Sequence, residues 1–215
     1  MCGKPHIFCD CRIHYNGRVY PLIHVTSYSL TREAVSKSLT LHIKNDRLDT
    51  AFDFVSDEMC RAFLERARPR RDMAALIGGW RPDDTRITWV PRSERARRAA
   101  GHDQGRELAL RIGKTLETPV LPSFYSRARS SQKALGRYQR MENAENSLVL
   151  ISSPDDIRGK NFILVDDIVT SGASLGVCAE RLISAGAKNV IMLVFAKTDH
   201  SKGLEEDTFN YYIDH

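Results

Sequence analysis

Residues 162–175, Phe-Ile-Leu-Val-Asp-Asp-Ile-Val-Thr-Ser-Gly-Ala-Ser-Leu, decide the fold. Phe162 to Val165 form a short apolar run, which is typical of a fully buried strand in a parallel sheet. Asp166 and Asp167 follow it directly, and open α/β sheets bind their ligands at the carboxyl ends of such strands. The small residues after them predict a tight turn into a helix that runs to about Ala185.

The turn in this segment has the composition of an anion site. Small side chains let backbone N–H groups approach a phosphate, and hydroxyls add further donors; the five residues are Thr170, Ser171, Gly172, Ala173 and Ser174. Unpaired amides and the positive end of the helix dipole stabilise an anion at such a position. The two carboxylates, in turn, accept strong hydrogen bonds from sugar hydroxyls. A solvated Asp-Asp turn before a Ser-capped helix would explain the acids or the cap, but not the order in which they follow the strand. This order of residues predicts a phosphosugar cradle.

The composition is that of one domain with an appendage. The 215 residues are 42% hydrophobic, which is enough to bury a sizeable core. No apolar stretch approaches the roughly 18 residues of a membrane span, and the N-terminus lacks an apolar signal region, so we expect a cytoplasmic protein. The cysteines are odd in number and lack paired spacings, which favours reduced thiols; they are Cys2, Cys9, Cys11, Cys60 and Cys178.

From residue 84 onward the pattern alternates between strands and helices. An amphipathic helix is expected over 104–116, and 209–213 is a candidate edge strand. Further strands are expected at 87–90, 119–124, 148–151 and 190–196. This β-α-β order predicts a parallel sheet.

The first 80 residues form a region of their own in this interpretation. A helix is expected over 56–66, with Ser56 as its N-cap. The sequence Gly78 to Pro82 predicts a boundary, which divides the chain into residues 1–80 and a core of residues 81–215. A sheet that holds a ligand at its carboxyl edge leaves one side of that ligand open, so we interpret the first region as a hood over the site.

Arginine is concentrated after two of the expected strands. The first run contains Arg92 and Ser93, and the second contains Arg127 and Arg129. Planar guanidinium groups suit a pyrophosphate. Such runs also form solvated or nucleic-acid-binding faces, so both interpretations stay open.

The segment 162–175 resembles, over its whole length, the 5-phosphoribosyl-1-pyrophosphate (PRPP) signature of type I phosphoribosyltransferases. The resemblance implies an α/β fold of that type, in which a mostly parallel open sheet is flanked by helices and has a small N-terminal hood. It implies that Asp166 and Asp167 face the ribose hydroxyls and that residues 170–174 hold the 5′-phosphate. Mg²⁺ is the implied cofactor, and no residue is assigned as a dedicated metal ligand.

A narrower resemblance is to the ComF family of amidophosphoribosyltransferase-like, GntX-like proteins, which are associated with DNA uptake. It covers about residues 86–197 and is carried by Val90-Pro91, Arg95 to Arg98, Gly101 to Gln104, Gln132, and Arg140 to Asn143. His102 and Asp103 replace the Phe-Asn of that family. The family also has a zinc ribbon with two Cys-x-x-Cys pairs, which this chain does not reproduce, so zinc binding by Cys2, Cys9 and Cys11 is left open.

These resemblances imply that a nitrogen nucleophile, in the simplest case a nucleobase, displaces pyrophosphate from C1 of PRPP. The implied catalytic residues are Asp166, Asp167, Arg127 and Arg129, and the implied substrate-binding set adds Arg92, Ser93 and residues 170–174. We expect residues 126–146 to close over the site as a lid. Two alternatives stay open: a PRPP-binding regulator without turnover, and an accessory of DNA uptake that binds single-stranded DNA. The oligomeric state, a homo-oligomer included, also stays open.

Overall fold

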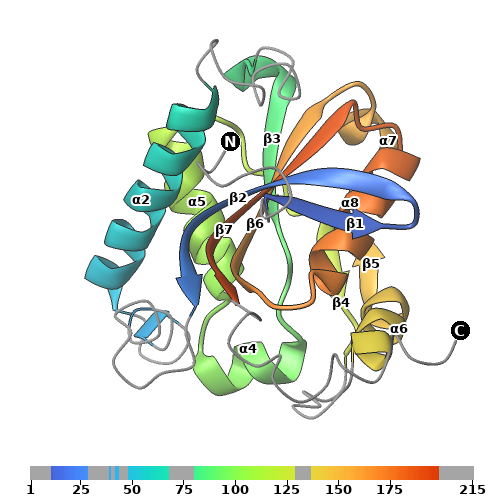
Figure 1. Cartoon of the computed structure of the whole chain (residues 1–215), viewed down its shortest axis with the longest axis horizontal. Coiled ribbons are helices and arrows are strands. Elements are labelled where there is room, and N and C mark those ends of the chain that lie inside the picture. The colour runs from blue at the N-terminus through green and yellow to red at the C-terminus, as the bar shows by residue number, and fades with distance from the viewer. Residues whose placement is uncertain are drawn as a thin grey trace, which may run out of the picture.

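The computed structural model describes residues 11–28, 39, 42–43, 48–67, 80–128 and 137–198. Its centre is a five-stranded sheet of order β1-β2-β7-β6-β3 (Figure 1). The four parallel strands are β2 (Arg18–Tyr28), β7 (Asn189–Thr198), β6 (Asn161–Val169) and β3 (Thr85–Trp89). The edge strand β1 (Arg12–Tyr15) runs antiparallel to β2. The expected α/β class with a mostly parallel sheet is confirmed.

Helices cover both faces of the sheet (Figure 1). One face carries α2 (Asp49–Ala67) and α5 (Gln104–Thr115), and the other carries α8 (Ala173–Ser184) and α6 (Arg137–Ser147). Because successive side chains of a strand point to opposite faces, Ile163 packs with the first pair of helices and Leu164 with the second. No helix in the described part of the chain is long and apolar enough to cross a membrane.

Two expected strands lie outside the main sheet. β4 (Phe124–Ser126) and β5 (Leu148–Leu150) pair antiparallel as a separate two-stranded sheet. The segment expected at 119–124 forms no strand of the main sheet and meets β3 through a single bridge at Val120, where Ile87 donates to the carbonyl of Pro119 and accepts the N–H of Leu121. Pro119 and Pro122 explain this difference, because neither has the N–H group that a ladder requires.

Part of the N-terminal region belongs to the central sheet. β1 and β2 form a hairpin closed by Asn16 and Gly17, whose φ angles of 46° and 73° suit a two-residue turn. The second half of β2 then pairs with β7. Residues 12–28 are therefore built into the sheet instead of covering it from outside. The division at residue 80 itself stays a prediction, because residues 68–79 lie outside the described ranges.

Helix α2 begins at Asp49, so the prediction that Ser56 caps it was wrong. Ser56 is 2% exposed in the middle of the helix, and its hydroxyl donates to the carbonyl of Asp53 at 3.0 Å. A serine hydroxyl can bond to the preceding turn in this way without ending a helix. Phe52 and Val55 are fully buried, so the apolar face that holds the helix on the core continues upstream of Ser56.

Three cysteines lie in the described ranges, and all are buried and outside any disulfide. Burial raises the pKa of Cys60 to about 11. Cys2 and Cys9 lie outside the described residues, as does the candidate edge strand at 209–213.

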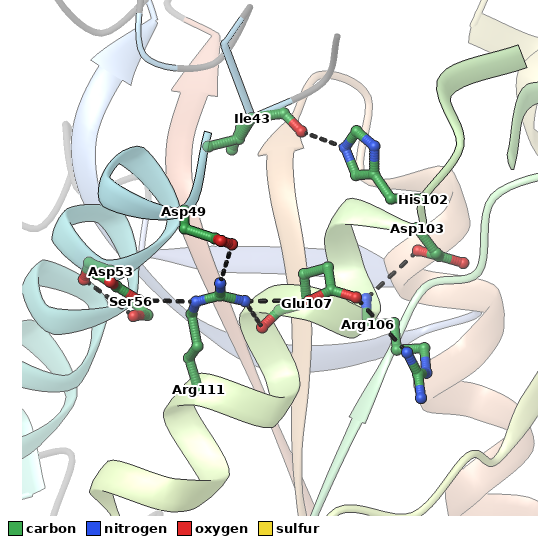
Figure 2. Close-up of polar contacts among 9 residues, drawn as sticks. All are labelled: Ile43, Asp49, Asp53, Ser56, His102, Asp103, Arg106, Glu107 and Arg111. Carbon is green, nitrogen blue, oxygen red and sulfur yellow. Dashed lines mark hydrogen bonds and ion pairs between the residues drawn. The ribbon is translucent and has the colours of Figure 1, made fainter. Parts of the chain in front are cut away.

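The guanidinium of Arg111 joins α5 to α2 (Figure 2). It donates to Asp49 at 2.8 Å, to Asp53 at 2.9 Å and to Glu107 at 3.1 Å. It also lies 5.0 Å from the centre of the Phe52 ring. Burial alone would lower the pKa of Arg111, but the hydrogen bonds to Asp53 and Glu107 outweigh burial and raise this pKa. A helix from the N-terminal region is thus fixed to a helix of the core.

Replacing Arg111 by Met should lower the free energy of unfolding by about 1–2 kcal/mol, because three carboxylates lose a shared partner. The loss stays this small because two of the three carboxylates are exposed to solvent, which weakens their ion pairs. Urea unfolding measures this loss. Arg106→Met is the matched control, since Arg106 lies on the same helix, has a 55% exposed side chain and reaches Glu107 only at 3.5 Å. Equal losses in the two variants would contradict the assigned role.

Candidate functional site

Strand β6 extends beyond its neighbour β3 at the carboxyl edge of the sheet. Its last pair with β3 joins Val165 to Trp89, whereas its pairing with β7 continues to Val169. Asp166 and Asp167 are therefore the first residues of β6 that lie past the end of β3. This is the edge at which the sequence places a ligand.

The two carboxylates lie on opposite faces of the sheet. Asp166 shares the face of α8, where burial and then the charge of Asp166 raise the pKa of Cys178. Asp167 is 4% exposed and shares the face of α5, where its Oδ2 accepts from Gln104 Nε2 at 3.5 Å. Asp166 also accepts the N–H of Asp167 at 2.9 Å, and Asp167 accepts that of Ile168 at 2.8 Å. The acidic pair thus flanks the strand end.

The turn 170–174 contributes to two adjoining cavities. A small cavity of 50 Å³ is lined by Asp166 and residues 168–175. A larger cleft of 470 Å³ is lined by Val90, Pro91, Ser126, Arg127, Ala128, Arg140, Asn143, Ala144, Asn146, Ser147, Leu148, Thr170, Ser171, Ala173 and Ser174. The turn therefore lies between a carboxylate on one side and arginines on the other.

The start of α8 needs glycine at two positions. Gly172 precedes the helix with a left-handed φ of 76°, and a Cβ atom there would lie 3.0 Å from Ile13. One turn later, a Cβ atom on Gly176 would lie 2.6 Å from the Tyr15 ring. β1 of the hairpin therefore packs directly against the turn 170–174 and the first turn of α8. Tyr15 continues to α6, where its hydroxyl donates to Glu145 at 2.6 Å.

The loop after β3 is tied to the beginning of α5. Asp103 caps α5 by accepting the N–H of Arg106 at 3.3 Å (Figure 2), and its other oxygen accepts the N–H of Arg92 at 3.2 Å. The preceding residue, His102, is 5% exposed and places Nε2 2.7 Å from the carbonyl oxygen of Ile43. Since Gln104 reaches Asp167, three consecutive residues link α5 to three separate parts of the chain.

The structure brings together part of the predicted site. Asp166, the turn 170–174 and Arg127 line the adjoining cavities. Ser93 instead caps α4 (Glu94–Ala100) by accepting the N–H of Ala96, and Arg92 lies in the loop beside it. Arg129 lies outside the described residues, as does the rest of the stretch 129–136 within the expected lid. The final part of that segment is helix α6, which packs on α8.

Several site residues were absent from the sequence-based set. Arg140 and Asn143 line the cleft, and Arg140 Nη1 donates to the Thr170 hydroxyl at 3.4 Å. Both belong to the Arg-x-x-Asn element that carries the resemblance to the ComF family, and neither is in the predicted site. Asp103 also had a detectable signal, because an aspartate directly before an amphipathic helix is a preferred N-cap.

Comparison with known proteins agrees with this geometry. The sequence profile of the family described as "Phosphoribosyl transferase domain" matches residues 104–213, just over half of the chain. The chain belongs to this family. The match contains the acidic pair, the turn and helix α8, so the fold type inferred from residues 162–175 is confirmed.

Individual proteins resemble this phosphoribosyl transferase chain only at low sequence identity. Competence protein F of Haemophilus influenzae is 25% identical over 92 residues, which are 42% of this chain. The match spans only 40% of the length of that relative. An adenine phosphoribosyltransferase structure covers 73% of this chain and 75% of its own at 17% identity, with a TM-score of 0.42. An L. donovani hypoxanthine-guanine phosphoribosyl transferase covers 67% and 70% at 13% identity, with a TM-score of 0.39.

Gly176→Ala should lower the free energy of unfolding by about 1–3 kcal/mol, because the added methyl group cannot fit against Tyr15. A double-mutant cycle with Tyr15→Ala isolates this clash. In the Tyr15→Ala background the glycine substitution should cost clearly less, because the ring atoms at 2.6 and 2.7 Å are gone and only the Cβ atom at 2.9 Å remains. An undiminished cost there would show that the hairpin is not what requires glycine at this position.

Proposed function

We propose that the protein binds PRPP and transfers its phosphoribosyl group to a nitrogen nucleophile, with release of pyrophosphate. The observation that carries the proposal is that Asp166 and the turn 170–174 line one cavity. An acceptor of hydroxyl hydrogen bonds thus lies next to an anion cradle, as a phosphorylated sugar requires.

The turn and its surroundings support a phosphate position in the cleft. The backbone N–H groups at the start of α8 and the hydroxyls of Thr170, Ser171 and Ser174 are the donors for the 5′-phosphate. Arg140 lies within reach of Thr170, which adds positive charge on the open side. In this arrangement Asp166 and Asp167 take the ribose hydroxyls from the two sides of the strand end.

The carboxylates suit a magnesium ion that is held together with the substrate. Within the described residues, no group of three or more His, Cys, Asp or Glu side chains could hold a metal by itself. Mg²⁺ is commonly bound by one or two carboxylates together with substrate phosphates, so Asp166, which lines the cavity, would hold it jointly with PRPP oxygens. When bound, it would offset the charge of the pyrophosphate.

The transfer needs positioning more than covalent help from the protein. The C1–O bond to pyrophosphate breaks with its electron pair leaving on the pyrophosphate, the C1–N bond forms, and the nucleophile loses a proton. Arg127, on the wall of the cleft, is assigned to the charge of the leaving group, and Arg129 is proposed to assist it. Holding the ribose and phosphate fixes C1 for the nucleophile.

A link to DNA uptake is a separate proposal. It rests on the name of the relative, Competence protein F, and on the ComF-like elements between residues 90 and 143. The basic helix α4, with Arg95, Arg97 and Arg98, suits a nucleic-acid phosphate. A nucleobase released or consumed during uptake would connect this link with the proposed chemistry.

Changing Asp166 and Asp167 together to Ala should weaken Mg²⁺-dependent PRPP binding by at least about 3 kcal/mol, because each carboxylate loses charge-assisted hydrogen bonds of about 1.5–3 kcal/mol. Titration calorimetry on folded protein measures the change. Asp83→Ala with Asp84→Ala is the matched control, since that pair precedes β3 at the opposite edge of the same sheet. Unchanged PRPP affinity in the first variant would reject the ribose assignment. A screen of nucleobases with PRPP and Mg²⁺, scored by pyrophosphate release, then separates a transferase from a regulator without turnover.

Arg127→Gln should weaken PRPP by about 1.5–3 kcal/mol, while ribose 5-phosphate, which lacks the pyrophosphate, should keep its affinity. Competition calorimetry with both ligands measures this difference. Arg158→Gln serves as the control because that exposed arginine lies at the end of α7 (Pro154–Ile157), outside the lining of the cleft. Equal losses for the two ligands would show that Arg127 does not meet the leaving group.

A further inference from the structure

A second cavity, of 510 Å³, lies beside the proposed PRPP cleft between α4 and β4. Its lining residues are Glu94, Arg95, Arg98, Tyr125, Ser126, Arg127 and Ala128. The last three also line the 470 Å³ cleft, so residues 126–128 form a wall between the two. The volume falls in the range of small-molecule sites, about 300–1,000 Å³.

The lining carries positive charge that the described residues do not offset. Glu94 pairs with Arg98 one turn along α4, so these two charges largely cancel. Arg95 and Arg127 are exposed, and neither makes an ion pair within the described part of the chain. Two guanidinium groups are therefore available for one anionic group.

Tyr125 supplies an aromatic surface in the same cavity. Its neighbours in β4, Phe124 and Ser126, are buried, whereas Tyr125 is 40% exposed. An exposed phenol ring packs well against a planar ring, and arginines bind a carboxylate in a fork geometry. The cavity therefore offers an aromatic surface for a planar ring and guanidinium groups for a carboxylate on that ring.

We propose that this cavity binds a planar aromatic ring that carries a carboxylate. Because Arg127 lines both cavities, this ligand and the pyrophosphate group of PRPP draw on the same guanidinium. Each therefore weakens the binding of the other by the same factor. The competition rests on the proposed function, whereas the site itself rests on the cavity alone.

The lining favours a small molecule over a strand of nucleic acid. A strand is bound along a continuous basic groove with successive stacking platforms. Here the seven lining residues include one aromatic side chain and one carboxylate, that of Glu94. A single ring with one anionic group matches that set.

Orotate and uracil form a matched pair of probes, since they share a ring and differ by a carboxylate. We expect calorimetry to show orotate binding at least about tenfold more tightly than uracil. Arg95→Gln and Tyr125→Ala should each weaken orotate by about tenfold. Arg97→Gln should leave orotate unchanged, because Arg97 is exposed on the same helix but is not among the lining residues.

Equal affinities for orotate and uracil would overturn the proposal, as would an Arg97→Gln variant that is impaired as much as Arg95→Gln. An oligo-dT strand that displaces orotate and binds more tightly would overturn it in favour of a nucleic-acid face. Saturating PRPP with Mg²⁺ should weaken orotate, and an unchanged orotate affinity in protein that binds PRPP would overturn the competition. Protein that binds orotate as described but no PRPP would overturn the proposed function and support the second site.

Discussion

The unequal length of two neighbouring strands is the constraint on which the site depends. β6 is paired on both sides up to Val165, and beyond that residue only β7 accompanies it. Full pairing buries the apolar part of the strand, and the loss of one neighbour opens the edge at Asp166 and Asp167. The turn that follows can then face the space above β3, where the cleft lies. A longer β3 would pair with the acidic residues and close this edge.

The second constraint is the close approach of the N-terminal hairpin to α8. Gly172 and Gly176 leave room for Ile13 and Tyr15, so β1 occupies space that a side chain at position 172 or 176 would otherwise fill. The turn 170–174 is therefore supported from behind by a strand that is far from it in the sequence. This support gives the N-terminal region a structural task in the sheet, in addition to any covering role of its remaining residues.

The sequence predicted best where one short segment carries all the information. Residues 162–175 contain the apolar run, the acids, the turn and the helix start, and the structure has these elements in that order. Predictions that depended on distant partners were less accurate. Ser56 looked like a cap because local signals cannot show that Phe52 and Val55 are buried against the core. Asn16-Gly17 is a strong hairpin signal in the sequence, but only the fold shows that its hairpin reaches α8.

The beginning of α5 shows why a site of this kind cannot be read from its signature segment alone. Asp103 holds the loop after β3 and Gln104 contacts Asp167, so one helix end positions residues from two strands. The same helix is fixed to α2 through Arg111. A shift of α5 would therefore move the basic loop and one carboxylate together. The helical layer on this face of the sheet thus sets the distance between the groups proposed to hold the sugar and the pyrophosphate, although none of its own residues lines the cleft.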